Sequence, residues 1–158
     1  IVERVGLFDP LRTIMGSEDF ILWLRIAKAG GRIAYHRKPI LHYRRRPDSL
    51  TADGVGLAER VIRVFGRVKS TMDLTPSEEK LLTAKMALHK ATLAWQLGGR
   101  AMAESDTDAA IRHWTDANQY FKTVKLTTML AMLRISPGFF RGLYRFHHRR
   151  APQRSPSH

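Results

Sequence analysis

Apolar residues recur at helical spacing over most of the chain. The first such stretch, residues 17–29, opens with a serine and two acids, continues as an apolar run and ends before Gly30 and Gly31. A polar residue before the first turn and glycine after the last one are the usual boundaries of a helix. We therefore predict a helix from Ser17 to Ala29.

Shorter patterns flank this helix and predict extended structure. Residues 1–15 are predicted to be the end of a strand or a loop. Apolar and polar residues alternate over 32–35, and a second short apolar segment covers 40–43. Alternation over a few residues is typical of a half-buried strand, so we predict a short strand in each segment. Residues 1–51 are thus expected to form an α/β unit.

After residue 51 the pattern is helical throughout. Apolar residues at helical spacing predict one helix over 57–72. The run Thr75-Pro76-Ser77-Glu78-Glu79 combines a capping residue, a proline and two acids, which predicts the start of a helix that continues to Gly98-Gly99. The other expected helices are one from near Asp106 to Tyr120, a Leu/Met-rich one that ends before Ser136-Pro137-Gly138, and a basic one over 139–150.

These patterns divide the chain into three segments. Residues 1–51 are the α/β unit, 52–150 are a helical extension, and 151–158 are a tail with few apolar residues that is expected to be disordered. The segment Trp95-Gln96-Leu97-Gly98, with Trp114 in the next helix, resembles a helix hairpin of the tetratricopeptide type. The predicted fold class is mainly α, with an α/β unit at its start.

Composition and charge narrow the chemistry. The 158 residues include 27 Lys or Arg and 14 Asp or Glu, so the net charge is +13. This charge favours phosphate-bearing partners such as nucleic acid, anionic lipid or a nucleotide. The chain has no cysteine, which excludes disulfides and a cysteine nucleophile within it and suits a reducing compartment. No apolar run approaches the roughly 20 residues that span a bilayer. The first residue is Ile rather than Met, so we expect a piece of a longer protein.

Glu18 and Asp19 have two competing interpretations. Acids in the first turn interact favourably with the helix dipole, each by about 0.3–1 kcal/mol, which explains both residues without any function. Asp19, however, lies four residues before Trp23, so that a carboxylate and a large ring share one helical face. This pairing is typical of sugar-binding sites. Asp19 and Trp23 are therefore candidate substrate contacts.

Short motifs in the first third of the chain resemble a known enzyme family. In chain order they are Val5-Gly6-Leu7-Phe8-Asp9, Ser17-Glu18-Asp19, Trp23-Leu24-Arg25, Gly31-Arg32-Ile33-Ala34-Tyr35, Pro39-Ile40-Leu41, Tyr43-Arg44 and Ser49-Leu50-Thr51. Together they resemble the acceptor-side half of the family 2 glycosyltransferases, inverting enzymes of the GT-A nucleotide-diphospho-sugar transferase fold. The resemblance implies that residues 1–51 are the C-terminal part of such a GT-A domain.

The resemblance also implies roles for single residues. Asp19 matches the Asp of the family's Glu-Asp pair, the general base that deprotonates the acceptor hydroxyl, and Glu18 matches its neighbour. Trp23 matches an aromatic residue that contacts the acceptor. Arg44 and Arg46 fall in a stretch implied to bind the donor's diphosphate, and Arg46 stands where many members have His. Arginine suits a diphosphate through its forked donors, but it is not a metal ligand.

The activity implied is sugar transfer, with inversion, from a nucleotide-diphospho-sugar to a sugar or lipid-linked acceptor, in the synthesis of a cell-surface polysaccharide or glycoconjugate. The implied location is the cytoplasm, at the inner face of the plasma membrane. A divalent metal, Mg²⁺ or Mn²⁺, is implied as cofactor, with ligands mostly outside this chain. The family's donor-binding half with its Asp-x-Asp motif is missing, so we expect the isolated chain to be inactive. Asp106-Thr107-Asp108 does not replace that motif, because it lies at a predicted helix start in the extension.

Two alternatives stay open. The net charge makes a basic helical module that binds nucleic acid or a partner protein, without catalysis, the main alternative to an enzyme. Against nucleic acid, aromatic residues are not interleaved with the basic cluster at 44–46, and no helix-turn-helix or zinc spacing occurs. The last helix, 139–150, mixes aromatic residues with arginines. It either lies on an anionic membrane or covers the preceding hairpin, and the sequence favours neither.

Overall fold

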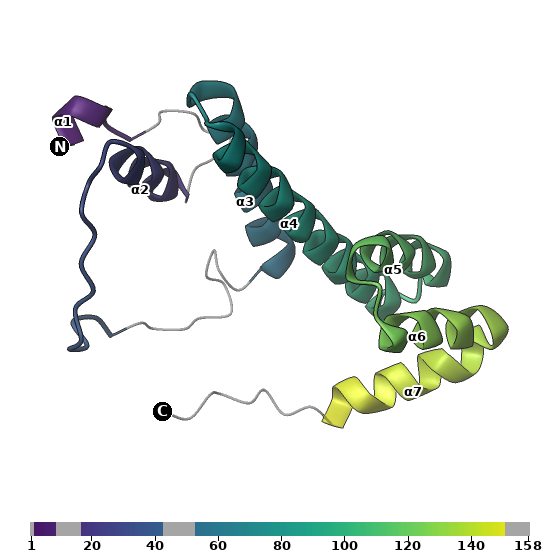
Figure 1. Cartoon of the computed structure of the whole chain (residues 1–158). Coiled ribbons are helices and arrows are strands. Elements are labelled where there is room, and N and C mark those ends of the chain that lie inside the picture. Colours follow the sequence, from purple (N-terminus) through teal and green to yellow (C-terminus); the bar gives the residue numbers. More distant parts are fainter. Residues whose placement is uncertain (1, 9–16, 43–52, 151–158) are drawn as a thin grey trace. The chain divides into compact units, whose positions relative to one another are not determined.

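The computed structural model describes residues 2–8, 17–42 and 53–150, with side chains up to Tyr144 in the last of these ranges. Every regular element in these ranges is a helix (Figure 1). In chain order they are α1 (Val2–Val5), α2 (Glu18–Lys28), α3 (Gly54–Thr71), α4 (Pro76–Ala103), α5 (Thr107–Phe121), α6 (Val124–Ile135) and α7 (Pro137–Arg150). They form two compact units, residues 1–89 and 90–158, and α4 contributes to both.

The predicted α/β unit is wrong. Residues 32–35 are irregular, residues 40–42 are irregular as well, and the ranges that the structure describes contain no strand. The first residues form a single helical turn, α1, instead of a strand end. A strand needs a neighbouring strand for its backbone hydrogen bonds and a core for its apolar face. Ile33 and Tyr35 are 68% and 88% exposed, so this segment has no apolar face against a core.

The helix predictions are confirmed, with shifted ends. Helix α2 has Ser17 at its N-cap position and Ala29 at its C-cap, as the sequence indicates. Helix α3 begins at Gly54, earlier than expected, and α4 continues through Gly98 and Gly99 to Ala103. Glycine weakens a helix interior but does not by itself end a helix. Residues of α4 before and after Gly98 and Gly99 pack in or against the core, among them Ala94, Ala101 and Met102.

The first unit is built on the packing of α2, α3 and the beginning of α4. Its buried core consists of Ile21, Val64, Phe65, Val68 and Leu82. The rings of Phe20 and Phe65 meet edge to face, with centroids 5.9 Å apart. Helices α2 and α3 therefore belong to the same compact unit. The division at residue 51, which follows the family resemblance, stays a prediction.

Helix α4 begins with a reciprocal cap that also ties it to α2. The backbone N–H of Thr75 donates to Glu78 Oε2 over 2.8 Å, and the backbone N–H of Glu78 donates to Thr75 Oγ1 over 3.3 Å. This is a capping box. Lys28 Nζ, at the end of α2, lies 2.7 Å from the same Glu78 oxygen. The bonds from Lys28 and Thr75 lower the pKa of Glu78 from 4.5 to about 2.

This arrangement predicts a loss of stability in acid that depends on Glu78. Because the pKa of Glu78 is lower in the folded chain, its ionised form stabilises the fold above about pH 4.5, and this contribution disappears as the pH falls to about 2. We expect Glu78→Gln to have a lower denaturation midpoint than wild type at neutral pH, and the difference to shrink in acid. Urea titrations of both chains across this pH range measure it.

Glu79 supplies the matched control for this measurement. It lies in the same turn and pairs with Lys69 at 3.2 Å, but it takes no part in the capping box. An exposed ion pair contributes about 0–1 kcal/mol, so Glu79→Gln should lose less than Glu78→Gln at neutral pH. Equal midpoints for wild type and Glu78→Gln at neutral pH would contradict the role of the cap and the ion pair.

The second unit is organised around Trp114 of α5. This side chain is 1% exposed, and its Nε1–H donates to the backbone oxygen of Trp95 over 3.1 Å. The Trp114 ring also packs against Phe140 and Tyr144 of α7, with centroids 6.4 Å and 6.1 Å away. The core further contains Ala101, Met102, Ala110, Ala117, Leu126, Leu130 and Leu133.

The predicted hairpin is present as a contact between the end of α4 and α5. The rings of Trp95 and Trp114 lie 5.7 Å apart, and a short turn over 104–106 joins the two helices. Its assignment to the tetratricopeptide type stays a prediction. The predicted tail, 151–158, lies outside the described residues. None of the helices in the described ranges combines the length and apolar content that a bilayer crossing requires.

Candidate functional site

The two acids at the start of α2 both bind backbone N–H groups. Glu18 Oε2 accepts from Ser17 N over 2.9 Å, and Asp19 Oδ1 accepts from Phe20 N over 2.8 Å. The Ser17 hydroxyl makes no capping bond, although Ser17 occupies the N-cap position. The carboxylates thus take over the capping that the serine was expected to perform. Asp19 is exposed, and its Oδ2 has no hydrogen bond to any residue that the structure describes.

Asp19 and Trp23 are both exposed on α2. The buried residues of this helix are Ile21, Leu22 and Ile26. Trp23 is 54% exposed, which is high for a side chain that is usually well covered. Since Asp19 and Trp23 are four residues apart in a continuous helix, they share one face. Helix α2 therefore places on one face the carboxylate and the ring that the sequence singled out.

The structure describes only some of the other residues that were considered for the site. Arg44 and Arg46 lie outside the described residues, so their position relative to Asp19 stays a prediction. Asp106 caps α5, with its Oδ1 accepting from Ala109 N over 2.9 Å, and Asp108 lies in the first turn. This confirms that Asp106 has a helix-start role.

A metal site is not formed by the part of the chain that the structure describes. No three side chains of His, Cys, Asp or Glu gather there closely enough to hold a metal ion. The described residues therefore do not fit the Mg²⁺ or Mn²⁺ that the resemblance implies, and no chemical step proposed below uses a metal. The resemblance assigns the metal's ligands mostly to residues outside this chain, which stays a prediction.

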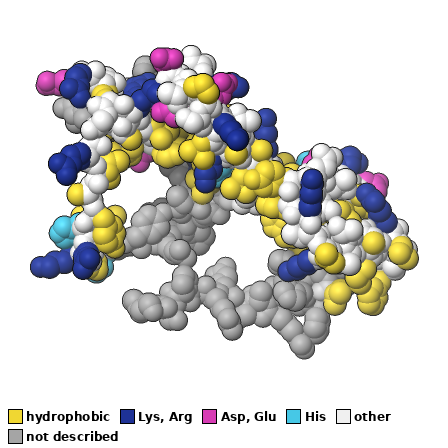
Figure 2. Space-filling model, viewed as in Figure 1, with side chains coloured by type: hydrophobic (Ala, Val, Ile, Leu, Met, Phe, Trp, Pro, Cys, Tyr) yellow, Lys and Arg dark blue, Asp and Glu magenta, His cyan; other side chains and the backbone are white. Residues whose placement is uncertain are grey.

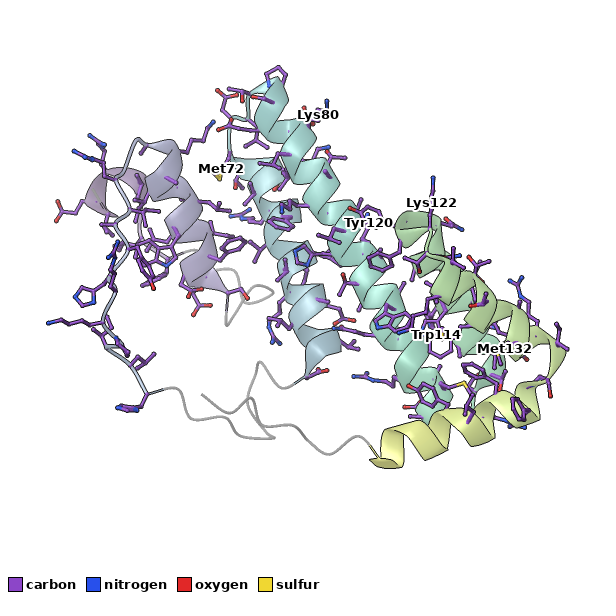
Figure 3. The ribbon with its side chains drawn as sticks, turned by 60° about the horizontal axis from the view of Figure 1, so that its bottom comes forward. Met72, Lys80, Trp114, Tyr120, Lys122 and Met132 are labelled. Carbon is purple, nitrogen blue, oxygen red and sulfur yellow. The ribbon has the colours of Figure 1, made fainter. Side chains whose placement is uncertain are left out.

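A groove lies beside the face of α2 that carries Asp19 and Trp23, within the first unit. It has a volume of about 580 Å³ and is lined mainly by apolar side chains, among them Phe20 and Leu24 of α2, Phe65 and Val68 of α3, and Leu81 of α4. Met72, labelled in Figure 3, also lines it. Binding sites for small molecules typically have volumes of about 300–1,000 Å³ and mostly apolar walls. The groove is therefore large enough for part of a ligand.

Charged groups stand at the edge of this groove. Lys28 and Glu78 form the ion pair described above, and Lys85 is exposed on α4. The lowered pKa of Glu78 keeps that carboxylate ionised over the whole physiological range. The groove thus combines an apolar interior with polar groups at its rim, which would orient an amphipathic ligand.

Neighbouring faces of α2 carry the acid–ring pair and the groove wall. Phe20 directly follows Asp19, and Phe20 and Leu24 repeat the spacing of Asp19 and Trp23 one residue later. Adjacent helical residues point about 100° apart, so the two pairs cover adjoining stripes. The groove is not predicted from the sequence. Its local signal in α2 is the apolar stripe of Phe20 and Leu24. The same spacing of apolar residues occurs in a helix that packs in a core without a groove.

No protein-family model, curated protein or solved structure matches this chain. The interpretation of the site therefore rests on the order of the motifs in residues 5–51 and on the geometry of α2. Both point to the same two side chains, Asp19 and Trp23.

Proposed function

We propose that this chain is the acceptor-side part of an inverting family 2 glycosyltransferase. The enzyme transfers a sugar from a nucleotide-diphospho-sugar to an acceptor hydroxyl, in the synthesis of a cell-surface polysaccharide or glycoconjugate. The observation that carries the proposal is the ordered set of motifs in residues 5–51. The shared, exposed face of Asp19 and Trp23 supports it. The proposal does not depend on the strands predicted at 32–35 and 40–43, of which residues 32–35 and 40–42 are irregular in the structure.

In this proposal Asp19 is the general base. Its Oδ2 takes the proton of the acceptor hydroxyl while that oxygen attacks the anomeric carbon of the donor sugar. The bond from that carbon to the diphosphate breaks, and the nucleoside diphosphate leaves with the bonding electrons. The hydrogen bond from Phe20 N to Oδ1 holds the carboxylate in a single orientation, so little reorganisation is needed for proton transfer.

Neighbouring residues bind and orient the two substrates. The Trp23 ring packs on the apolar face of the acceptor sugar, and Arg44 and Arg46 bind the donor's diphosphate. The apolar groove next to Phe20 takes the hydrocarbon part of a lipid-linked acceptor, whose sugar then lies at the start of α2. This division of labour explains why one short helix carries both a polar pair and an apolar wall.

The location that we propose with this activity is the cytoplasm, at the inner face of the plasma membrane. A chain without cysteine suits a reducing compartment, and a lipid-linked acceptor requires access to a membrane surface. Fractionation of cells that carry the tagged full-length protein tests this location.

The class of activity is tested by incubating the full-length enzyme with labelled nucleotide-diphospho-sugars and a membrane lipid extract. Transfer to an acceptor with inverted anomeric configuration supports the proposal. No transfer with any donor, together with tight binding of RNA or DNA by the same protein, would replace it with the nucleic-acid-binding alternative.

Trp23→Ala is expected to weaken acceptor use without changing donor binding. Aromatic packing contributes about 0.5–1.5 kcal/mol beyond simple area burial, so the acceptor KM should rise about two- to tenfold. Initial rates at saturating donor and varied acceptor measure this change. Trp23→Phe keeps a ring and should recover most of the affinity. If the acceptor KM of Trp23→Ala stays at the wild-type value, the exposed ring has no part in acceptor binding.

A further inference from the structure

The end of α6 and the outer side of α7 leave large apolar side chains uncovered. Met132 and Ile135 of α6 are 43% and 84% exposed, and Phe139 and Leu143 of α7 are 65% and 47% exposed. We call these four residues the corner patch, because Ser136 alone separates the two helices. Figure 2 shows hydrophobic side chains gathered at this corner of the second unit. Met132 is labelled there in Figure 3.

The adjoining stripe of α7 explains why the corner patch is not simply part of the core. Phe140 is buried, and it and Tyr144 pack on Trp114. These two aromatic residues cover the preceding hairpin. Phe139 and Leu143 are four residues apart on another side of the same helix. A surface helix that faced only water would be polar on that side. Helix α7 is instead apolar on two adjoining stripes, one that packs on Trp114 and one that is exposed.

The charges within the two helices that carry the corner patch are of one sign. The last acid of the chain is Asp116, and the segment from residue 117 to 150 contains only basic charges. They are Lys122, Lys125, Arg134, Arg141, Arg145, Arg149 and Arg150. Arg134 and Arg141 lie within the two helices that carry the patch, and Arg134 is exposed. An apolar surface on helices that carry only cationic charges complements anionic lipid headgroups over an acyl interior.

We propose that the corner patch is a docking site for an anionic membrane surface. Ile135, Phe139 and Leu143 insert among the acyl chains, while Arg134 and Arg141 contact the headgroup phosphates. This inference rests on the second unit alone and does not depend on the glycosyltransferase proposal. It extends the membrane contact expected from residues 139–150 to the end of α6, and it assigns the inner aromatic residues of α7 to the core.

Charge also argues against two other occupants. A second copy of the chain, joined by a two-fold axis, would bring the same cationic surfaces face to face, and their repulsion opposes the contact. Nucleic acid would use the basic residues but would leave the aliphatic side chains of Ile135 and Leu143 without a partner, because phosphates and sugars offer no apolar interior. A bilayer satisfies both the charge and the apolar surface.

The test is co-sedimentation of the whole chain with vesicles. We expect binding to phosphatidylcholine vesicles that contain phosphatidylglycerol, weaker binding at high salt, and little binding to phosphatidylcholine alone. The double variant Ile135→Ser/Phe139→Ser should reduce the partition coefficient at least about tenfold, because each removed side chain loses its burial in the acyl layer. Val124→Ser is the matched control. Val124 is 79% exposed at the other end of α6, and its replacement should leave binding unchanged.

Each other outcome overturns the proposal. Wild-type partitioning by the double variant would show that the corner patch does not enter the bilayer. Equal binding to both vesicle types would remove the role of the basic residues. A concentration-dependent dimer that the double variant disperses, without vesicle binding, would assign the patch to a second copy. Since Ile135 is 84% exposed, the single variant Ile135→Ser keeps the test decisive if the double variant unfolds.

Discussion

Replacing Asp19 with asparagine is expected to lower kcat/KM of the full-length enzyme about 10²–10⁴-fold, the usual contribution of a general base. Asparagine has the shape of aspartate and keeps an oxygen that accepts the hydrogen bond from Phe20 N, so α2 should still form. It cannot take a proton from the acceptor hydroxyl. Donor binding should stay at its wild-type value, because this side chain contacts only the acceptor in the proposal. Steady-state kinetics and donor titration together measure both expectations.

Glu18→Gln is the matched control for this experiment. Glu18 neighbours Asp19 and also binds a backbone N–H, but adjacent helical residues point about 100° apart, so only Asp19 shares the face of Trp23. We expect Glu18→Gln to lose stability by up to about 1 kcal/mol and to retain most of its turnover. Melting curves of both variants separate the two roles. If Asp19→Asn melted early but turned over normally per folded molecule, Asp19 would be a helix-start acid and nothing more.

Helix positions could be predicted from sequence because their signals are local. Thr75 and Glu78 cap α4 through groups three residues apart, and Asp106 caps α5 through the N–H of Ala109. Such contacts form within one turn and do not depend on the rest of the fold. Local signals are less reliable at helix ends that pack in a core. Gly98-Gly99 predicts the end of α4, but the helix continues to Ala103 because the second unit packs around its last turns.

The strand predictions failed because a strand depends on distant residues. The alternating pattern of Arg32, Ile33 and Tyr35 satisfies the local rule, but that pattern stabilises an extended segment only against a neighbouring strand and a core. In the described ranges neither is present beside it, and Ile33 and Tyr35 face solvent. The family resemblance implies the same α/β unit, and that expectation fails for the same reason. It transfers a sheet whose other strands are not among the described residues.

The candidate site was predicted in part. Asp19 and Trp23 could be paired from their spacing alone, since a helix brings residues four apart onto one face. The groove beside them is formed by side chains of α2, α3 and α4. The spacing of residues within one helix does not predict how far apart three helices pack. The corner patch also depends on contacts between helices. The sequence predicts an amphipathic last helix, but only the contacts of Phe140 and Tyr144 with Trp114 show which of its apolar residues remain uncovered.

Gly98→Ala is expected to destabilise the second unit by about 1–3 kcal/mol, the usual cost of overpacking a core. In an ordinary helix interior, replacing glycine with alanine would raise the free energy of unfolding by about 1 kcal/mol. The sign of the measured change therefore distinguishes the two cases. Here a Cβ on residue 98 would overlap the Trp114 ring and lie 2.8 Å from its Cγ. The surrounding contacts prevent the Trp114 ring from moving away. It is 1% exposed, bound through Nε1 to Trp95 and packed against Phe140.

Two comparisons make this prediction decisive, both measured by urea denaturation. Gly142 is a glycine of α7 in the same unit, and a Cβ there would meet nothing within 4 Å, so Gly142→Ala should stabilise by roughly 0.5–1 kcal/mol. In a Trp114→Leu background the smaller side chain leaves room for the added methyl group, so the cost of Gly98→Ala should disappear. A stabilising Gly98→Ala in the wild-type chain, equal to that of Gly142→Ala, would mean that the end of α4 does not pack on Trp114. The core of the second unit, and with it the uncovered outer side of α7, would then have to be assigned differently.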